Sequence, residues 1–383
     1  MRPLSNKFNK SGGFDSSENF GSSGSSENSG KLGSSGKSAT ILEVARLAGV
    51  SPSTISNALN GKKNRMSGET LDRVMRAVRD LGYEPNRMAR GLKTGFVSII
   101  GLIVPSVENP FWGAFARCAE HAAMARNCQV MLCNGERDID REQRYAESML
   151  SLGIRGLILG SSPLSMKHLG GLARRGLKIV AFDRAGSDED GLKIDSVRVD
   201  NRGGVAMAVG HLLRLGHKRI AFVAGPINSA NRIDRLEAYR QTLRAHGITP
   251  TPAWEWLEMT SAGSKGEDSK IGLAGARHLL AQQDAPTGFV AINDMTAFGV
   301  LAGAREAGLH IPRDVSVVGF DDIHIGNMSN PPLTTIRQPL DALMQAAVSV
   351  LLDRMSGANT GAPTHVSLPA ELIVRGSCGR AKE

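Results

Sequence analysis

The chain has 383 residues, 41% of them hydrophobic, and a net charge of +9. This length predicts two or three domains, and the lack of any run of about 18 apolar residues excludes a membrane-spanning helix. No apolar leader stands at the N-terminus, so we expect a cytoplasmic protein. The four cysteines and nine histidines follow no metal-ligand spacing, and the sequence therefore predicts neither a metal site nor a cofactor.

Residues 1–39 are rich in Ser, Gly and Asn, and their only aromatic residues are Phe8, Phe14 and Phe20. Such a segment buries too little apolar surface to offset its chain entropy. We predict a disordered tail here.

The stretch from Thr40 to Gly61 has the pattern of two short helices joined by a tight turn. Thr40 and Glu43 have the spacing of a capping box, and Gly49 can adopt the positive φ that a tight turn needs. Ser51 and Pro52 suit the start of the second helix. The apolar residues of the first helix recur at helical spacing: Ile41, Val44, Ala45 and Ala48.

The second helix has two faces of different chemistry. Its apolar face holds Ile55, Ala58 and Leu59, and the opposite face holds Ser53, Ser56, Asn57 and Asn60. Short hydrogen-bonding side chains without a carboxylate suit a helix that enters the major groove of DNA. An ordinary capped helical hairpin with a solvated outer face would show the same pattern.

A third helix is predicted from Ser67, a good N-cap, to Gly82, with an apolar stripe of Leu71, Val74, Val78 and Leu81. Residues 40–97 contain ten basic and five acidic residues, a net charge of +5, which is more than half of the chain's excess. This local density favours a polyanionic partner, although a solvated basic surface would also show it.

From residue 98 onward, apolar runs alternate with amphipathic helical stretches. This alternation predicts an α/β fold of parallel sheets covered by helices on both faces, and the number of runs suggests two sheets. The runs are SIIGLIVP, QVMLC, GLILG, KIVAFD, SVRVD, RIAFVAG, GFVAIND, SVVGFD and TTIRQ.

The stretch TILEVARLAGVSPSTISNALNG resembles the DNA-binding headpiece of the lactose/galactose repressor (LacI/GalR-type) family. The likeness continues, in the family's order, through YEPNRMARGLKTG, NPFW, FDR, LGHKRIAFVAGP, AINDMTAFGVL, DVSVVGFDD and PPLTTIRQP. The resemblance implies a three-helix headpiece at 40–84, a hinge at 85–97 and a core at 98–383. The core would hold two doubly wound subdomains of periplasmic-binding-protein type, at 98–199 plus 338–366 and at 200–337 plus 367–383.

The resemblance also implies which residues contact DNA. In the family, the hinge becomes helical on operator DNA and a leucine wedges open the central base step, as apolar side chains can. The segment from Pro85 to Leu92 is too short to hold a helix alone, and Gly91 inside it adds to the cost. A plain interdomain linker is the alternative interpretation. The expected DNA contacts are Pro52, Ser53, Thr54, Ser56, Asn57, Asn60, Ala89, Arg90, Leu92 and Lys93. Asn57 stands where relatives often carry Arg, so the base read there is open.

Polar and aromatic residues follow several predicted strands, where open α/β sheets bind ligands. Carboxylates and amides bind vicinal hydroxyls, and an aromatic face covers a sugar ring. A single strand-end Asp can equally be a helix N-cap, and we expect Asp294 and Asp322 to be helix caps or structural residues. The segment 254–270 is longer than the matching segment of the family, which normally carries one cleft contact. Trp254 and Trp256 are the candidates for that contact here. Carried over from the family, the effector residues are Phe111, Trp112, Ser162, Asp183, Arg235, Asn293, Asp321 and Gln338; Asn109 precedes the first two.

The resemblance implies a repressor that binds double-stranded operator DNA as a homodimer and responds to a small effector between the subdomains. A sugar or sugar derivative is expected, with a purine as the alternative. No heptad-patterned tail follows Arg375, which favours a dimer over a tetramer. A small-molecule carrier would have a leader and no headpiece. No nucleophile elbow, phosphate-binding loop or dinucleotide motif is present, so we do not expect an enzyme.

Overall fold

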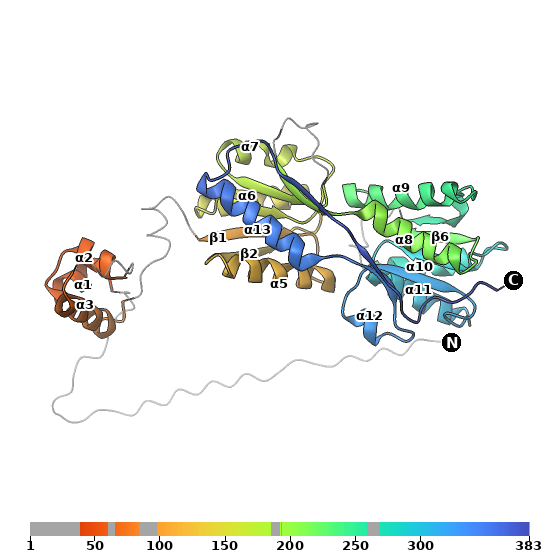
Figure 1. Ribbon diagram of the computed structural model, residues 1–383, viewed down its shortest axis with the longest axis horizontal. Helices are drawn as coiled ribbons and strands as arrows, with labels where there is room; N and C mark the ends of the chain where they lie inside the picture. The colour runs from red at the N-terminus through yellow and green to blue at the C-terminus, as the bar shows by residue number, and fades with distance from the viewer. Residues whose placement is uncertain are drawn as a thin grey trace, which may run out of the picture. The chain divides into compact units, whose positions relative to one another are not determined.

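The computed structural model describes residues 39–59, 66–83, 98–184, 192, 194–258 and 268–382 (Figure 1). The chain divides into two compact units, Met1–Pro85 and Asn86–Glu383, and each is described by itself. The predicted tail, the predicted hinge and Asn60 lie outside the described residues, apart from the last residue of the tail. No helix in the described ranges is long and apolar enough to cross a membrane.

The first unit contains the three predicted helices, α1 (Ile41–Ala48), α2 (Pro52–Leu59) and α3 (Gly68–Asp80). Thr40 and Glu43 form the capping box, and Gly49 ends α1 with a left-handed φ of 64°. Ser67 caps α3 by accepting a hydrogen bond from Thr70 N. All three helices contribute buried residues to one small core. These residues are Val44, Ala45, Ala48, Ile55, Ala58, Val74 and Ala77. The helix-turn-helix prediction is confirmed.

The second unit is built from two lobes, each around a six-stranded sheet. The sheet of lobe one has the order β11-β5-β4-β3-β1-β2, and that of lobe two has the order β12-β10-β9-β8-β6-β7. All neighbours pair in parallel except β10 and β12, which are antiparallel. The predicted α/β class with two parallel sheets is confirmed.

Lobe one comprises β1 (Ile99–Val104), α5 (Pro110–Met124), β2 (Gln129–Asn134), α6 (Ile139–Ser151), β3 (Gly156–Leu159), α7 (Lys167–Arg174), β4 (Lys178–Phe182), β5 (Asp195–Val199), α13 (Leu340–Ser356) and β11 (His365–Leu368). Lobe two comprises α8 (Asn201–Arg214), β6 (Ile220–Ala224), α9 (Ala230–Ala245), the 3-10 helix Pro252–Trp254, β7 (Glu255–Leu257), α10 (Asp268–Leu280), β8 (Gly288–Ala291), α11 (Asp294–Glu306), β9 (Ser316–Asp321), α12 (Ile325–Met328), β10 (Thr334–Arg337) and β12 (Glu371–Ile373).

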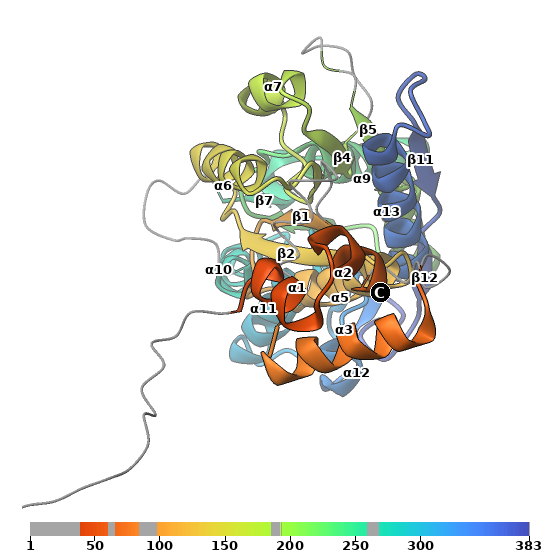
Figure 2. The ribbon, with the colours of Figure 1, turned by 90° about the vertical axis from the view of Figure 1, so that its left-hand side faces the viewer.

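The strands are apolar throughout because helices cover both faces of each sheet. In β3, Leu157 and Leu159 belong to the core beneath α6 and α7, whereas Ile158 belongs to the core beneath α5 and α13. Figure 2 shows α6 and α7 on one side of this sheet and α13 on the other. A strand buried on both faces needs no polar residue in alternation, which explains the continuous apolar runs.

The chain passes between the lobes three times, after β5, after β10 and after β11. The predicted boundary at residue 366 falls inside β11, because Ser367 and Leu368 still pair with Arg198 and Val199 of lobe one. The third crossing therefore lies between Leu368 and Glu371. Since the lobes share one set of crossings, the strand ends of both face a common cleft.

Candidate functional site

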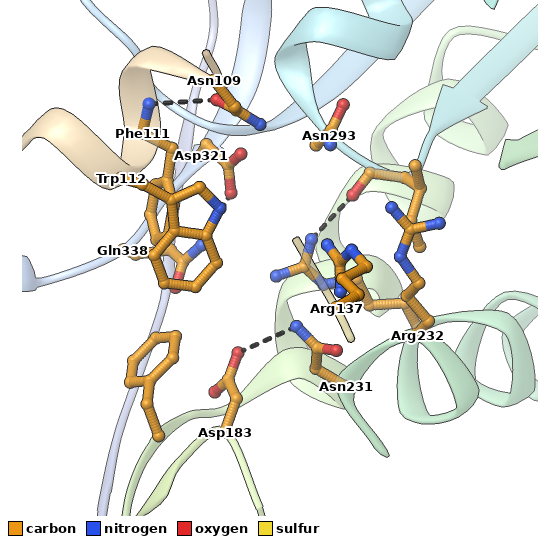
Figure 3. A pocket seen from close by; sticks show the side chains of 13 residues that line it. Asn109, Phe111, Trp112, Arg137, Asp183, Asn231, Arg232, Asn293, Asp321 and Gln338 are labelled. Atoms are coloured by element: carbon orange, nitrogen blue, oxygen red, sulfur yellow. Dashed lines mark hydrogen bonds between the residues drawn. The ribbon is translucent and has the colours of Figure 1, made fainter. Parts of the chain in front are cut away.

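A pocket lies between the lobes, at the carboxyl ends of their strands (Figure 3), and its empty space, open solvent included, is about 380 Å³. Seven of the eight predicted effector residues line it, and Ser162 does not. The lining residues are Asn109, Phe111, Trp112, Arg137, Phe182, Asp183, Asn231, Arg232, Arg235, Ile292, Asn293, Asp321 and Gln338.

One wall of the cavity is aromatic and belongs to lobe one. Asn109 caps α5 by accepting from Phe111 N at 3.0 Å, which places Phe111 and Trp112 in the first turn of that helix. The Trp112 ring contacts Phe111 and Phe182 edge-on, with centroid distances of 4.9 and 6.1 Å. Gly160, at the end of β3, leaves room for the indole, since a Cβ there would lie 2.9 Å from a Trp112 ring carbon. The wall is therefore rigid and preformed.

Asp183 follows β4 and carries the polar chemistry of lobe one. Its carboxylate accepts from Val199 N at 3.0 Å and from Asn231 Nδ2 of lobe two at 3.4 Å. Burial raises the pKa of Asp183, although Arg235 and these hydrogen bonds act against the rise. Ser162 lies behind it and donates to the Asp183 carbonyl at 2.7 Å, so it supports the site rather than lining it.

Arg235 and Asp321 form the centre of the site in lobe two. The Arg235 guanidinium lies 3.5 Å from the centroid of the Phe320 ring and donates to Asn201 Oδ1 and Ile292 O, both at 2.7 Å. Burial raises the pKa of Asp321 well above its ordinary value, and the Arg235 charge opposes this. Gln338 donates to Asp321 at 2.7 Å. These contacts hold the Arg235 and Asp321 side chains in place.

Strained backbone is concentrated around the cleft. Among the described residues, seven non-glycine residues have positive φ, and six of them follow the strands at this edge: Glu136, Arg137, Ser162, Asp183, Asp321 and Asp322. Each such conformation costs about 1–3 kcal/mol, and residues of this kind gather at functional sites because the surrounding structure fixes them there. The strand-end turns are therefore shaped for the site rather than for stability.

Five lining residues were not predicted, Arg137, Phe182, Asn231, Arg232 and Ile292, and neither was Asp268, which lies beside the cavity. Asn231 and Arg232 lie one turn before Arg235 on α9, and this spacing was a usable signal. Arg137 stands in the connection between β2 and α6, where no pattern marked it. Asp268 begins α10 and accepts from Asn293 Nδ2 at 2.7 Å and from Arg232 at 3.4 Å.

The tryptophan candidates for a cleft contact were wrong. Trp254 and Trp256 pack into the core of lobe two, where Trp254 donates to Asp284 O and Trp256 lies 4.9 Å from the His278 ring. Their segment reaches the cleft through Asp268 instead.

Asp294 and Asp322 have structural partners, as expected. Asp294 is fully buried, accepts from Ile323 N at 2.9 Å and from the Thr335 hydroxyl at 2.5 Å, and burial raises its pKa to about 6. Asp322 pairs with Arg337 and Arg375. Among the described residues, no group of three or more His, Cys, Asp or Glu side chains could hold a metal ion.

The candidate DNA-contacting side of α2 carries its small polar residues. Ser51 accepts from Thr54 N at 3.1 Å and lies 2.7 Å from the Ser53 hydroxyl, so the helix start is ordered. Pro52 and Ser53 are exposed, and Thr54, Ser56 and Asn57 are half-buried. No acidic residue lies in α2. The remaining predicted contacts, Asn60, Ala89, Arg90, Leu92 and Lys93, lie outside the described residues.

A helix-turn-helix unit and a two-lobed, parallel-sheet unit with a polar cleft together define a class: DNA-binding regulators with a ligand-binding core. The family model described as "Bacterial regulatory proteins, lacI family" matches residues 40–86. That of the "Periplasmic binding protein-like domain" matches residues 209–378.

Similar proteins agree with these matches. The HTH-type transcriptional repressor PurR of Haemophilus influenzae (strain PittEE) is 30% identical over 88% of this chain and 98% of its own length. The ribose operon repressor of Escherichia coli (strain K12) is 32% identical, over 83% of this chain and 93% of its own. The structure of the Lac repressor dimer bound to operator and the anti-inducer ONPF matches with a TM-score of 0.77 and 27% identity, over 89% of this chain and 99% of its own. The chain belongs to the lacI family of bacterial transcriptional regulators.

Proposed function

We propose that the chain is a cytoplasmic, homodimeric repressor whose affinity for a pseudo-palindromic operator is set by an effector in the cleft. Its similarity to two named repressors and to a repressor dimer on its operator supports this role. In a dimer, two copies of α2 would enter successive major grooves, one helical turn apart. The cleft binds a ligand in this proposal and carries no reaction.

The observation that carries the proposal is that both lobes hold one another across the cleft. Ala230 N of lobe two donates to Ser162 O at 3.0 Å, and Asn231 donates to Asp183 at 3.4 Å. Asn109 of lobe one lies 3.5 Å from Asp268 of lobe two. A ligand that contacts both lobes changes the stability of this arrangement relative to an open one, and such differential binding is what couples two sites.

The chemistry of the cleft favours a sugar-like effector. Carboxylate and amide groups of Asp183, Asn231 and Asp321 line the cavity together with the Trp112 and Phe111 side chains. Acceptors and donors beside an aromatic wall suit a ring with hydroxyl groups on its edge and C–H groups on its face. A purine would use the same wall for stacking, and it is the alternative outcome of the test.

The test begins with operator DNA selected by the full chain from random duplexes. Affinity is measured by fluorescence anisotropy between 50 and 200 mM salt, where about six phosphate contacts predict a loss of about 10³-fold. Sugars, sugar derivatives and purines are then screened for release or tightening of that DNA. Asn231→Ala should weaken the ligand response and leave DNA affinity unchanged. A chain that selects no sequence, or one whose selected DNA responds to no ligand, contradicts the proposal.

A further inference from the structure

Two positive side chains from opposite lobes meet at the same cavity. Arg137 comes from the connection between β2 and α6 in lobe one, and Arg232 comes from the first turn of α9 in lobe two. Figure 3 shows both on the side of the cavity away from the Trp112 ring. Arg232 donates to Pro226 O at 3.1 Å and lies 3.4 Å from Asp268. Arg137 forms no hydrogen bond or ion pair with any residue that the structure describes.

The position of Arg137 is set by the backbone. Glu136 and Arg137 adopt left-handed φ values of 51° and 56° in succession, and Asp138 then caps α6. Glu136 is held by Arg141 at 2.8 Å. Two consecutive strained residues persist only where the fold fixes them, so the guanidinium is aimed at the cleft by construction.

The carboxylates of Asp268 and Glu142 attract the Arg137 guanidinium, but neither forms an ion pair with it, and Glu142 contacts His168 at 3.2 Å. Its surroundings lower the pKa of Arg137 to about 10, through burial of the guanidinium and then through the Arg232 charge. Asp268 is already engaged by Arg232 and Asn293. Burial raises the pKa of Asp183 and of Asp321, and the Arg235 charge acts against the rise at both carboxyls.

We propose that the effector is a polyhydroxylated anion whose carboxylate or phosphate group bridges Arg137 of lobe one and Arg232 of lobe two. This inference rests on the proposed function, in which a ligand in the cleft controls DNA binding. Two guanidiniums drawn together by closure of the lobes repel each other, and an anion between them replaces this repulsion with attraction to both lobes. Guanidinium groups offer paired N–H donors that match carboxylate and phosphate oxygens.

The first measurement is a thermal-shift and calorimetric comparison of matched ligands on the full chain. Each neutral ligand is paired with its anions: glucose with gluconate and glucose 6-phosphate, ribose with ribose 5-phosphate, and adenosine with AMP. Inorganic phosphate controls for the charge alone. We expect at least one anion to raise the Tm while its neutral partner does not, and the arm that responds distinguishes a carboxylate from a phosphate.

The second measurement compares two arginine variants with that anion. Arg137→Gln should weaken its binding by about 10- to 100-fold, the range expected for a lost charged hydrogen bond. Arg137→Lys should recover part of the loss. Arg144→Gln is the matched control, because Arg144 is an exposed arginine of α6 that does not line the cavity. It should change the affinity for the anion by less than about twofold.

The outcomes separate the two proposals. The anionic effector is overturned if neutral ligands bind as well as their anions, or if Arg137→Gln leaves the affinity unchanged. Either result leaves the proposal of a ligand-controlled repressor intact. If neither the neutral ligands nor the anions change the Tm, both the anionic effector and the effector cleft itself are contradicted.

Discussion

Gly272 and Gly299 allow α10 and α11 to approach more closely than any other residue would. A Cβ on Gly272 would lie 2.0 Å from the carbonyl oxygen of Thr296, and a Cβ on Gly299 would lie 2.0 Å from that of Ser269. Both obstacles are backbone atoms, so no rotamer change relieves them. Gly272→Ala must therefore push the helices apart, and overpacking of this kind costs about 1–3 kcal/mol.

The displacement reaches the cleft because both helices begin there. Asp268 is the first residue of α10, and Asn293 caps α11 and donates to Asp268 at 2.7 Å. Thermal unfolding of the full chain should show a lower Tm for Gly272→Ala, by about 2–4 °C for each kcal/mol lost. Calorimetry should show weaker ligand binding in the same variant.

Gly171→Ala is the matched control. Gly171 is an exposed residue of α7, and a Cβ there would meet nothing within 4 Å. Alanine is a better helix former by about 1 kcal/mol, so this variant should be slightly stabilised. A Gly272→Ala variant that is as stable as Gly171→Ala, or one that binds ligand normally, would refute the reasoning from helix contact to cleft geometry.

Three further changes test the cleft and the DNA-contacting helix. Asp321→Asn should raise the urea resistance of the protein at pH 8 and abolish its ligand response. Burial raises the pKa of Asp321 in the folded state. The contribution of this acid to stability is therefore present below its unfolded-state pKa of about 3.9 and is lost as pH rises through its folded-state pKa. Equal pH dependence in variant and wild type would contradict this. Gly160→Ala should push the Trp112 ring into the cavity and weaken ligand binding by about tenfold in calorimetry, with no change in DNA affinity. Asn57→Ala should relax the preference at one base pair of the half-site by about 1–3 kcal/mol in competition binding. An unchanged preference would place Asn57 away from the bases.

The sequence predicted those parts of the fold that local chemistry determines. The capping box at Thr40 and the glycine at Gly49 mark the first helix-turn-helix junction, and both act in the structure as expected. All nine predicted apolar runs are strands. The strands that sequence patterns missed, β7, β11 and β12, lie at sheet edges and are only partly buried. These three strands have no continuous apolar run, unlike the edge strand β2, so their sequences look like loops.

The strand-end rule predicted part of the site. Asp183, Asn293 and Asp321 stand at or just after the ends of strands, and the parallel topology brings them together. Asn231 and Arg232 lie one turn before the predicted Arg235 on α9, so their helical spacing was a signal that went unused. Arg137 reaches the cleft through a strained turn, and no local pattern marked it.

The cleft combines several features that oppose stability. Left-handed backbone at Arg137, Asp183 and Asp321, buried carboxyl groups, and two guanidiniums from opposite lobes each raise the free energy of the folded protein. In the proposed mechanism, a ligand would supply hydroxyls to the carboxyls and negative charge to the guanidiniums, and would lower that free energy where it contacts both lobes. The features that weaken the fold would then be the source of the differential affinity by which an effector acts on DNA binding.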